Sequence, residues 1–442
     1  MFRPASALIL TISASLFAQN PSGWETLANA PFVSRHNDAY FVTPTLGWIV
    51  NGDGQIFRTD DRGSSWVMQF EQSSSHFRSV GFVDSLRGWV GNVGQGEFSA
   101  TDGNPLYHTE DGGLTWLPVT TFIGQHPRGL CGMFVLNDTV ICAVGRVRGP
   151  SFFVRTIDGG KTWSSKDMSA YAAGLIDVHF FHPDSGYAVG LTHTLHDSSS
   201  GVVLFTGDGG ETWERRFVSA RRGEWCWKIS FPSLRTGYVS LQRNSGSPVY
   251  ILKTSDGGVT WQEKLFTTFN YFAQGIGFVS ETKGWIGGNS AYPVYETEDG
   301  GESWHPADFG IRVNRFRFLG DTLGYAVGRT VYRYSKSAVS TVTATKGEPP
   351  SSFELQQNFP NPFNPLTTIR YYVPRRAEVK VAIYDLGGSK VKDLIDATLD
   401  RGMKSVIWNG TDQHGRPVTT GTYFCVLRSG EGADMKKMLL LH

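Results

Sequence analysis

Six aspartates recur along this chain, and paired carboxylates are the groups that glycoside hydrolases use as acid, base or nucleophile. Each lies in an eight-residue stretch like TEDGGLTW, residues 109–116. These stretches also contain glycine and Ser or Thr, which are typical of turns, where a carboxylate accepts hydrogen bonds from nearby backbone N–H groups. We therefore predict a structural role for all six. They are Asp61, Asp111, Asp158, Asp208, Asp256 and Asp299.

A second set of residues has side chains suited to binding. It contains arginines, histidines and aromatic residues that we expect in the loops entering the innermost strand of each repeat. Arginine pairs well with carboxylates, and aromatic residues are enriched at interfaces, so the set could bind an anionic glycan, peptide or acidic protein. The alternative is a group of solvated loop residues with packed stems. The set is Arg35, His36, His76, Arg78, His126, Arg128, Arg221, Arg222, Trp225, Tyr271, Arg315 and Arg317.

Regular spacing indicates the elements that position these residues. The six aspartates are 43 to 50 residues apart, which is the length of a four-stranded propeller blade. Six units also carry a glycine followed by an aromatic residue, with a phenylalanine seven positions before that aromatic. The aromatic residues are Trp48, Trp89, Tyr187, Tyr238, Trp285 and Tyr325, and the phenylalanines are Phe41, Phe82, Phe180, Phe231, Phe278 and Phe318. A third unit is irregular, with Phe134 eight positions before Cys142, which brings the total to seven units.

The seventh unit, residues 312–335, stops where its aspartate stretch should begin. The segment from Trp24 to Leu27 resembles the residues that follow the turns elsewhere, such as Trp213 to Arg216. We expect this N-terminal strand to complete the last blade and to remove an exposed sheet edge. The predicted fold is all-β: a seven-bladed β-propeller over residues 19–338, closed by the N-terminal strand, followed by a small immunoglobulin-like β-sandwich.

The repeated stretch resembles the Asp-box, or bacterial neuraminidase repeat, of β-propellers. Families with this repeat include sialidases, xyloglucanase-type hydrolases, sortilin-like receptors and photosystem II assembly factors, and the spacing here is most similar to the last. The sialidase Arg-Ile-Pro stretch is missing, and xyloglucanases resemble two facing propellers where this chain has one. The histidines form no HExxH or comparable cluster. We therefore assign no catalytic, cofactor-binding or metal residues.

Composition argues against some classes of function. Lys and Arg total 41 and Asp and Glu total 40, so nothing indicates a nucleic-acid partner. Four cysteines are too few for a disulfide framework; Cys131 and Cys142 could pair across a turn or be buried small hydrophobes. Residues 1–18 have the charge and apolar run of a secretory signal peptide, and no later segment is long enough to span a bilayer.

Residues 339–350 are small, polar and proline-ended, which is typical of a linker. In the tail, residues 351–442, alternation around Val381 and Cys425 indicates antiparallel strands. Its QNFPNPFNP stretch resembles the type A C-terminal sorting domain of the type IX (Por) secretion system. That resemblance implies transport of the folded protein across the outer membrane. The motif residues are Asn358, Pro360, Asn361, Pro362, Phe363, Asn364 and Pro365.

These observations favour a secreted or cell-surface propeller that is not an enzyme and that binds a protein or glycan partner. The type IX machinery is the second expected partner, through the tail. Two alternatives stay open on the same propeller. One is a secreted glycoside hydrolase of the sialidase or xyloglucanase kind, and the other is an assembly factor for an extracytoplasmic complex.

Overall fold

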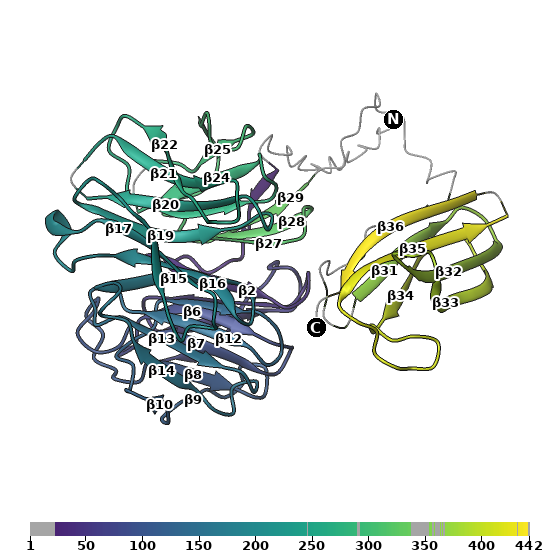
Figure 1. The fold of residues 1–442 in the computed structure, drawn as a ribbon, viewed down its shortest axis with the longest axis horizontal. Coiled ribbons are helices and arrows are strands. Elements are labelled where there is room, and N and C mark those ends of the chain that lie inside the picture. The colour runs from purple at the N-terminus through teal and green to yellow at the C-terminus, as the bar shows by residue number, and fades with distance from the viewer. Residues whose placement is uncertain are drawn as a thin grey trace, which may run out of the picture.

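The computed structural model describes residues 23–244, 246–289, 292–336, 353–355, 358, 363, 365, 367–430 and 432–440. The predicted signal peptide and linker lie outside these residues. Within them the chain is all-β apart from one short 3-10 helix, η1 (His196–Ser198). The strands form two separate groups, which are coloured purple to green and yellow-green to yellow in Figure 1.

The first group contains seven antiparallel sheets, with one parallel pair, β10 beside β14. Six of them have four strands and one has five. The first three sheets are β2 (His36–Phe41), β3 (Gly47–Asn51), β4 (Gln55–Thr59) and β5 (Val67–Glu71); β6 (Phe77–Phe82), β7 (Gly88–Asn92), β8 (Leu106–Thr109) and β9 (Leu117–Pro118); and β10 (Ile123–Gly124), β11 (Gly132–Val135), β12 (Ile141–Gly145), β13 (Phe152–Thr156) and β14 (Ser164–Asp167).

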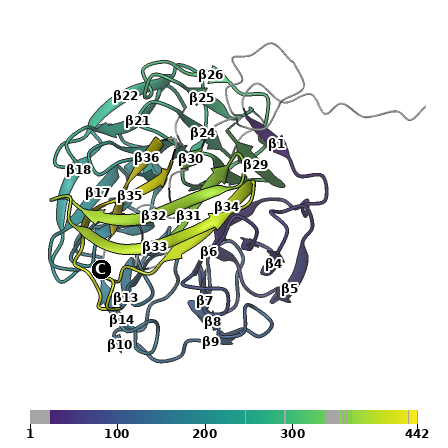
Figure 2. The same cartoon turned by 90° about the vertical axis from the view of Figure 1, so that its right-hand side faces the viewer.

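The other four sheets continue in chain order. They are β15 (Gly174–His182), β16 (Ser185–Leu191), β17 (Gly201–Thr206) and β18 (Glu214–Val218); β19 (Glu224–Ser230), β20 (Gly237–Arg243), β21 (Val249–Thr254) and β22 (Gln262–Thr267); β23 (Ala273–Phe278), β24 (Gly284–Gly288), β25 (Tyr295–Thr297) and β26 (His305–Pro306); and β27 (Arg315–Leu319), β28 (Leu323–Val327), β29 (Val331–Ser335) and β1 (Trp24–Thr26). Figure 2 shows these sheets following one another around a common centre.

The first strands of the seven sheets lie nearest that centre. In the five-stranded sheet this innermost strand is β11, and the contacts run in the order β2, β6, β11, β15, β19, β23 and β27, with β27 beside β2. The N-terminal strand β1 pairs antiparallel with β29, and Trp24 lies opposite Tyr334. The Trp24 ring is buried and stacks on Phe309 with ring centroids 4.7 Å apart. The two ends of this group of strands are therefore joined in one sheet.

The glycine–aromatic pairs of the sequence have a packing explanation. The Phe41 ring lies against Gly47 of the neighbouring strand, where a side chain would place Cβ 2.3 Å from the ring. The same ring stacks on Tyr325 of the preceding sheet, 3.6 Å between centroids. Trp48 and Phe82 repeat this stacking at 3.5 Å. Glycine is thus required in one strand so that an aromatic ring can join two sheets.

The second group of strands is the tail. One sheet has the order β33 (Lys390–Leu399), β32 (Ala377–Asp385), β35 (Gly421–Ser429) and β36 (Gly432–Leu440), and the other has the order β30 (Glu354–Leu355), β31 (Thr367–Val373) and β34 (Gly402–Trp408). Val381 lies opposite Leu427, and Ile383 lies opposite Cys425, all four buried. The alternation predicted around these residues therefore corresponds to paired antiparallel strands whose inward side chains form one core.

Candidate functional site

The six repeated aspartates form local turns with the same hydrogen bonds. In the turn of Asp111, one carboxylate oxygen accepts the backbone N–H of Thr115 at 2.9 Å, and the other accepts its hydroxyl at 2.6 Å. These two bonds lower the pKa of Asp111 to about 2. Gly113, at φ +92°, donates its N–H to the Thr109 hydroxyl in a conformation that favours glycine. The carboxylates are occupied by their own turns.

Four of these turns also accept a hydrogen bond from an aromatic residue of a neighbouring sheet, at the carbonyl of the residue that follows the aspartate. The indole of Trp48 donates to the carbonyl of Gly112 at 3.3 Å, and the hydroxyl of Tyr238 donates to Gly300 at 3.2 Å. Tyr325, from the last sheet, donates in the same way to Arg62 of the first turn at 3.2 Å. The repeated aromatic residues and the aspartate turns therefore form one set of contacts between sheets.

The predicted binding residues are placed differently from the sequence expectation. Several lie in the first strands themselves and not in the loops that enter them: His36, Arg78, Trp225, Arg315 and Arg317. In five of the sheets, the pairing between the first and second strands has a register shift in a similar part of the first strand, for example between Phe77 and Ser79. Such bulges re-aim side chains. In this part Arg78 projects from its strand as a buried side chain.

Four of the residues at the centre form an ion-pair network, which we call the channel cluster: Asp38, Asp177, Arg315 and Arg317. Arg315 donates two hydrogen bonds of 2.8 Å to Asp177, which belongs to a sheet that is not adjacent, and lies 3.0 Å from Asp38. Arg317 lies 3.1 Å from Asp38. Burial alone would raise the pKa of Asp177, but the charges of Arg315 and then Lys228 lower it well below its ordinary value. These arginines are therefore already paired inside the protein.

A row of aromatic and cationic side chains lies beside the channel cluster. The guanidinium carbon of Arg78 is 5.5 Å from the Phe98 ring and 5.4 Å from the Trp227 ring. Trp227 stacks in parallel with Trp225 at 6.1 Å, and His76 stacks on Phe98 at 4.8 Å. Burial lowers the pKa of His76 to about 3, followed by repulsion from Arg78. His76 is therefore neutral near pH 7, and the positive charge here comes from arginine.

The remaining predicted residues do not join one site. His126, Arg128 and Arg222 are exposed, whereas His36 is buried and contacts the carbonyl of Pro31. Arg35 donates to Gln274 at 2.6 Å.

Two more of the predicted residues bind neighbouring groups of the protein. Arg221 pairs with Glu224 at 2.6 Å and Glu263 at 2.7 Å, and the buried Tyr271 donates to Pro293. The set therefore divides into buried structural residues and exposed cations.

Sequence reasoning missed Asp38, Asp177 and Lys228 at the centre. Asp177 stands between the apolar residues Ile176 and Val178 in a buried part of its strand, and that isolated charge was the available signal. It also missed the loop between β7 and β8, which carries Phe98, and the loop between β12 and β13, which carries the exposed Arg148. Arg148 lies 5.8 Å from the Phe98 ring. The segment between Trp89 and Asp111 is longer than the corresponding segment of the first unit, from Trp48 to Asp61. That extra length was the signal for the loop between β7 and β8.

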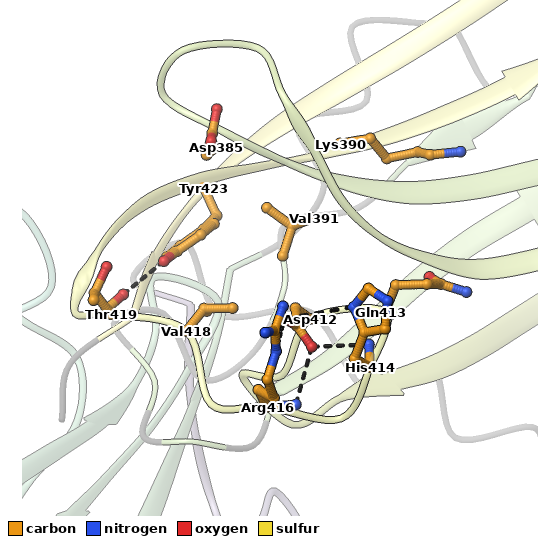
Figure 3. Close-up of a pocket in the computed structure, with 10 residues that line it drawn as sticks. All are labelled: Asp385, Lys390, Val391, Asp412, Gln413, His414, Arg416, Val418, Thr419 and Tyr423. Atoms are coloured by element: carbon orange, nitrogen blue, oxygen red, sulfur yellow. Dashed lines mark hydrogen bonds and ion pairs between the residues drawn. The ribbon is translucent and has the colours of Figure 1, made fainter.

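Two hollows of about 400 Å³ lie away from these residues. One lies beside the Asp299 turn and includes Lys253, whose ammonium donates to Gly300. The other lies in the tail and is lined by residues that include Asp385, Asp412 and Tyr423 (Figure 3). Asp412 accepts hydrogen bonds from the backbone N–H groups of His414 and Arg416. The tail carboxylate therefore stabilises a turn.

Other features of the described residues bear on the sequence expectations. In that part of the chain all four cysteines are buried free thiols, including Cys131 and Cys142. No cluster of three or more His, Cys, Asp or Glu side chains is arranged there to hold a metal ion. No helix in the same residues is long and apolar enough to cross a membrane. Pro360, Asn361, Pro362 and Asn364 lie outside the described residues, whereas Asn358 and Phe363 are buried.

No protein-family profile matches the chain. Over 308 residues it is 24% identical to the photosystem II assembly lipoprotein Ycf48 of a Synechococcus strain, a match that covers 64% of this chain and 79% of that protein. It is also 24% identical to a xyloglucanase of a Paenibacillus species over 287 residues, which are 55% of this chain and only 26% of that enzyme.

Solved structures with a similar fold also include β-propeller proteins. Ycf48 bound to a D1 peptide superposes with a TM-score of 0.53 at 19% identity, over 71% of this chain and 97% of that one. PorZ, a surface component of the type IX secretion system of Porphyromonas gingivalis, has a TM-score of 0.53 at 12% identity, over 94% of this chain and 60% of that one. The chain therefore has a β-propeller fold similar to that of photosystem II assembly factors.

Proposed function

We propose that this protein is a secreted or cell-surface propeller, not an enzyme, that binds an acidic protein partner, with a glycan as the other ligand class. In this proposal the seven sheets are seven blades, and β1 closes the ring. The observation that supports it is the exposed Arg148, whose guanidinium lies 5.8 Å from the exposed Phe98 ring. In this proposal the exposed Arg128 and Arg222 belong to the same surface, which we call the mouth: Arg128, Arg148, Arg222 and Phe98. Arginine and aromatic side chains together favour protein interfaces.

The buried carboxylates support a binding role over hydrolysis. A glycosidase needs two carboxyl groups facing a substrate cleft at about 5 to 10 Å from one another. Asp38 and Asp177 are held by arginines, and Asp102 accepts the hydroxyl of Tyr107 at 2.7 Å. Glu97 and Glu224 are also buried beside arginines. Each of these five carboxylates is engaged inside the protein by an arginine or a hydroxyl.

The relatives fit this proposal in two ways. Ycf48 is named as an assembly protein and has been solved with a peptide, which supports a protein ligand for the same fold. PorZ is named as a surface component of a secretion system, which supports an extracytoplasmic location. An assembly role for some other complex is compatible with both. The xyloglucanase match keeps hydrolysis as the second candidate.

Charge reversal at the mouth tests the proposal. The mature chain, residues 19–442, is titrated against matched acidic and basic peptide libraries by fluorescence anisotropy. We expect binding of acidic peptides only, and a loss of at least about tenfold in affinity in Arg128→Glu/Arg148→Glu, because two attractive charges become repulsive. Lys161→Glu, an exposed change in the Asp158 turn, is the matched control and retains affinity. Unchanged binding in the double variant, or turnover of a polysaccharide, would contradict the proposal.

For the tail we propose an immunoglobulin-like fold and type IX sorting. The buried Asn358 donates to the Thr367 hydroxyl at 2.9 Å, and Phe363 contacts Trp408 with ring centroids 5.3 Å apart, so described motif residues belong to the tail core. Deleting residues 351–442 should leave the protein in the periplasm of its native host. Fusing the same residues to an unrelated exported reporter should bring the reporter to the surface. Surface delivery of the truncated chain would contradict sorting.

A further inference from the structure

The centre of the first group of sheets holds more positive than negative charge. The buried carboxylates near Arg35, Arg78, Lys228 and the two arginines of the channel cluster are Glu97, which is also paired with Arg146, and the two aspartates Asp38 and Asp177. Both aspartates are fully engaged: Asp177 also accepts the backbone N–H of Ile229 at 3.1 Å, and Asp38 also accepts that of Val80 at 3.2 Å. Further cations at this level must therefore find another counter-charge.

Arg78 and Lys228 differ from the other three cations, each of which donates a hydrogen bond to a side chain. Both side chains are completely buried, and neither has a hydrogen-bond partner among the described residues. The nearest carboxylate oxygen to Lys228 is that of Asp177, 3.9 Å from its ammonium, beyond hydrogen-bond distance. The Arg78 guanidinium lies against the rings of Phe98 and Trp227, and the nearby Glu97 carboxylate that attracts it is itself paired with Arg146 at 3.6 Å. Rings attract a cation but cannot accept its N–H groups in the plane of the guanidinium as an anion does.

The two cations are close enough to influence one another. Arg78 lies over the ring of Trp227, the residue next to Lys228. After burial, repulsion from Arg315 and also Arg78 lowers the pKa of Lys228 to about 7, against attraction from Asp177 and Asp38. Burial also lowers the pKa of Arg78. The Ser79 hydroxyl, on the same strand, is a further buried group without a hydrogen-bond partner among the described residues.

We propose that a small monovalent anion of halide size binds inside the ring between Arg78 and Lys228. A buried guanidinium and a buried ammonium that are hydrogen-bonded to no carboxylate of the described residues supply several N–H donors and two positive charges for it. A larger oxyanion or a peptide carboxylate is disfavoured because both cations lie beneath the surface. Arg78 contacts Phe98 of the mouth, but both cations of this site are buried, and the site does not depend on the proposed function.

Halide-specific stabilisation of the full mature chain tests this site. Its thermal midpoint is measured in sodium bromide, chloride and fluoride at equal ionic strength. We expect bromide and chloride to raise the midpoint by about 2–4 °C over fluoride, because a ligand that binds only the folded state stabilises it. Arg78→Met and Lys228→Met should each abolish this difference, whereas Arg128→Met, an exposed cation, should retain it.

A bromide-soaked crystal of the wild-type chain gives a second readout that does not require the variants to fold. We expect an anomalous peak within hydrogen-bond distance of Arg78 and Lys228. Equal midpoints in all three salts, a halide effect that persists in both Met variants, or no anomalous signal at this place would each overturn the site.

Discussion

Aspartate has two different roles at the two levels of this ring. In the turns, Asp111 and its five counterparts bind groups within four residues along the chain, and each turn is complete in itself. In the channel cluster, Asp177 binds Arg315, which lies 138 residues away. The turn carboxylates are exposed and repeated, whereas the channel carboxylates are buried and unlike one another. Repetition thus identifies local structure, and irregular charge identifies contacts across the ring.

The comparison predicts the largest loss of stability in the channel cluster. Replacing Arg315 by Met leaves Asp177 and Asp38 buried with incomplete compensation. We expect the free energy of unfolding to fall by about 3–5 kcal/mol, the usual cost of removing one partner of a buried ion pair. Urea denaturation followed by tryptophan fluorescence measures it. A loss below about 1 kcal/mol would mean that the cluster is not a structural contact across the ring.

Replacing Lys228 should change stability in the opposite direction to replacing Arg315, because the buried charge of Lys228 is not fully compensated. Its pKa is lowered to about 7 in the folded protein, so the unfolded chain binds more protons between about pH 7 and 10. Stability should therefore rise with pH over this window, by at most about 1.4 kcal/mol per pH unit. In Lys228→Met this rise should be missing. The comparison is made in sodium fluoride, so that no bound chloride or bromide holds the lysine charged.

Removing a turn carboxylate should cost little stability, and the contribution of that carboxylate should depend on pH only in acid. The pKa of Asp111 is lowered to about 2, so its contribution is complete above about pH 4 and is lost as the pH falls through about 2. We expect Asp111→Ala to cost about 1 kcal/mol at pH 7 because the lost hydrogen bonds are open to water. The variant should also lose less stability than wild type between pH 4 and 2. A cost above about 3 kcal/mol would contradict the local character of the turns.

The smallest effect belongs to the exposed mouth. Arg128→Met removes a cation that is exposed and lies outside the channel cluster. We expect a change in the free energy of unfolding within about 0.5 kcal/mol, measured by urea denaturation. A larger change would mean that Arg128 is part of the central network and cannot serve as an independent binding residue.

The fold was accessible from the sequence because its determinants are repeated. Glycine beside an aromatic residue, and aspartate in a turn, recur with the same spacing, and each has a local physical cause such as the Phe41 ring on Gly47. The site was less accessible. The inward position of Arg78 depends on a register shift in its strand, which the residue types alone do not predict. The pairing of Arg315 with Asp177 depends on how the fold brings two distant sheets together at the centre.

The pairing of β1 with β29 has a consequence for how the molecule is made. Trp24 leaves the ribosome early and must wait for Tyr334, about three hundred residues later, before its sheet can form. Formation of this sheet is therefore a late event in folding that depends on a contact of very high sequence separation, which slows folding. The same arrangement means that a synthetic peptide of residues 23–28 could be supplied separately to a chain lacking it.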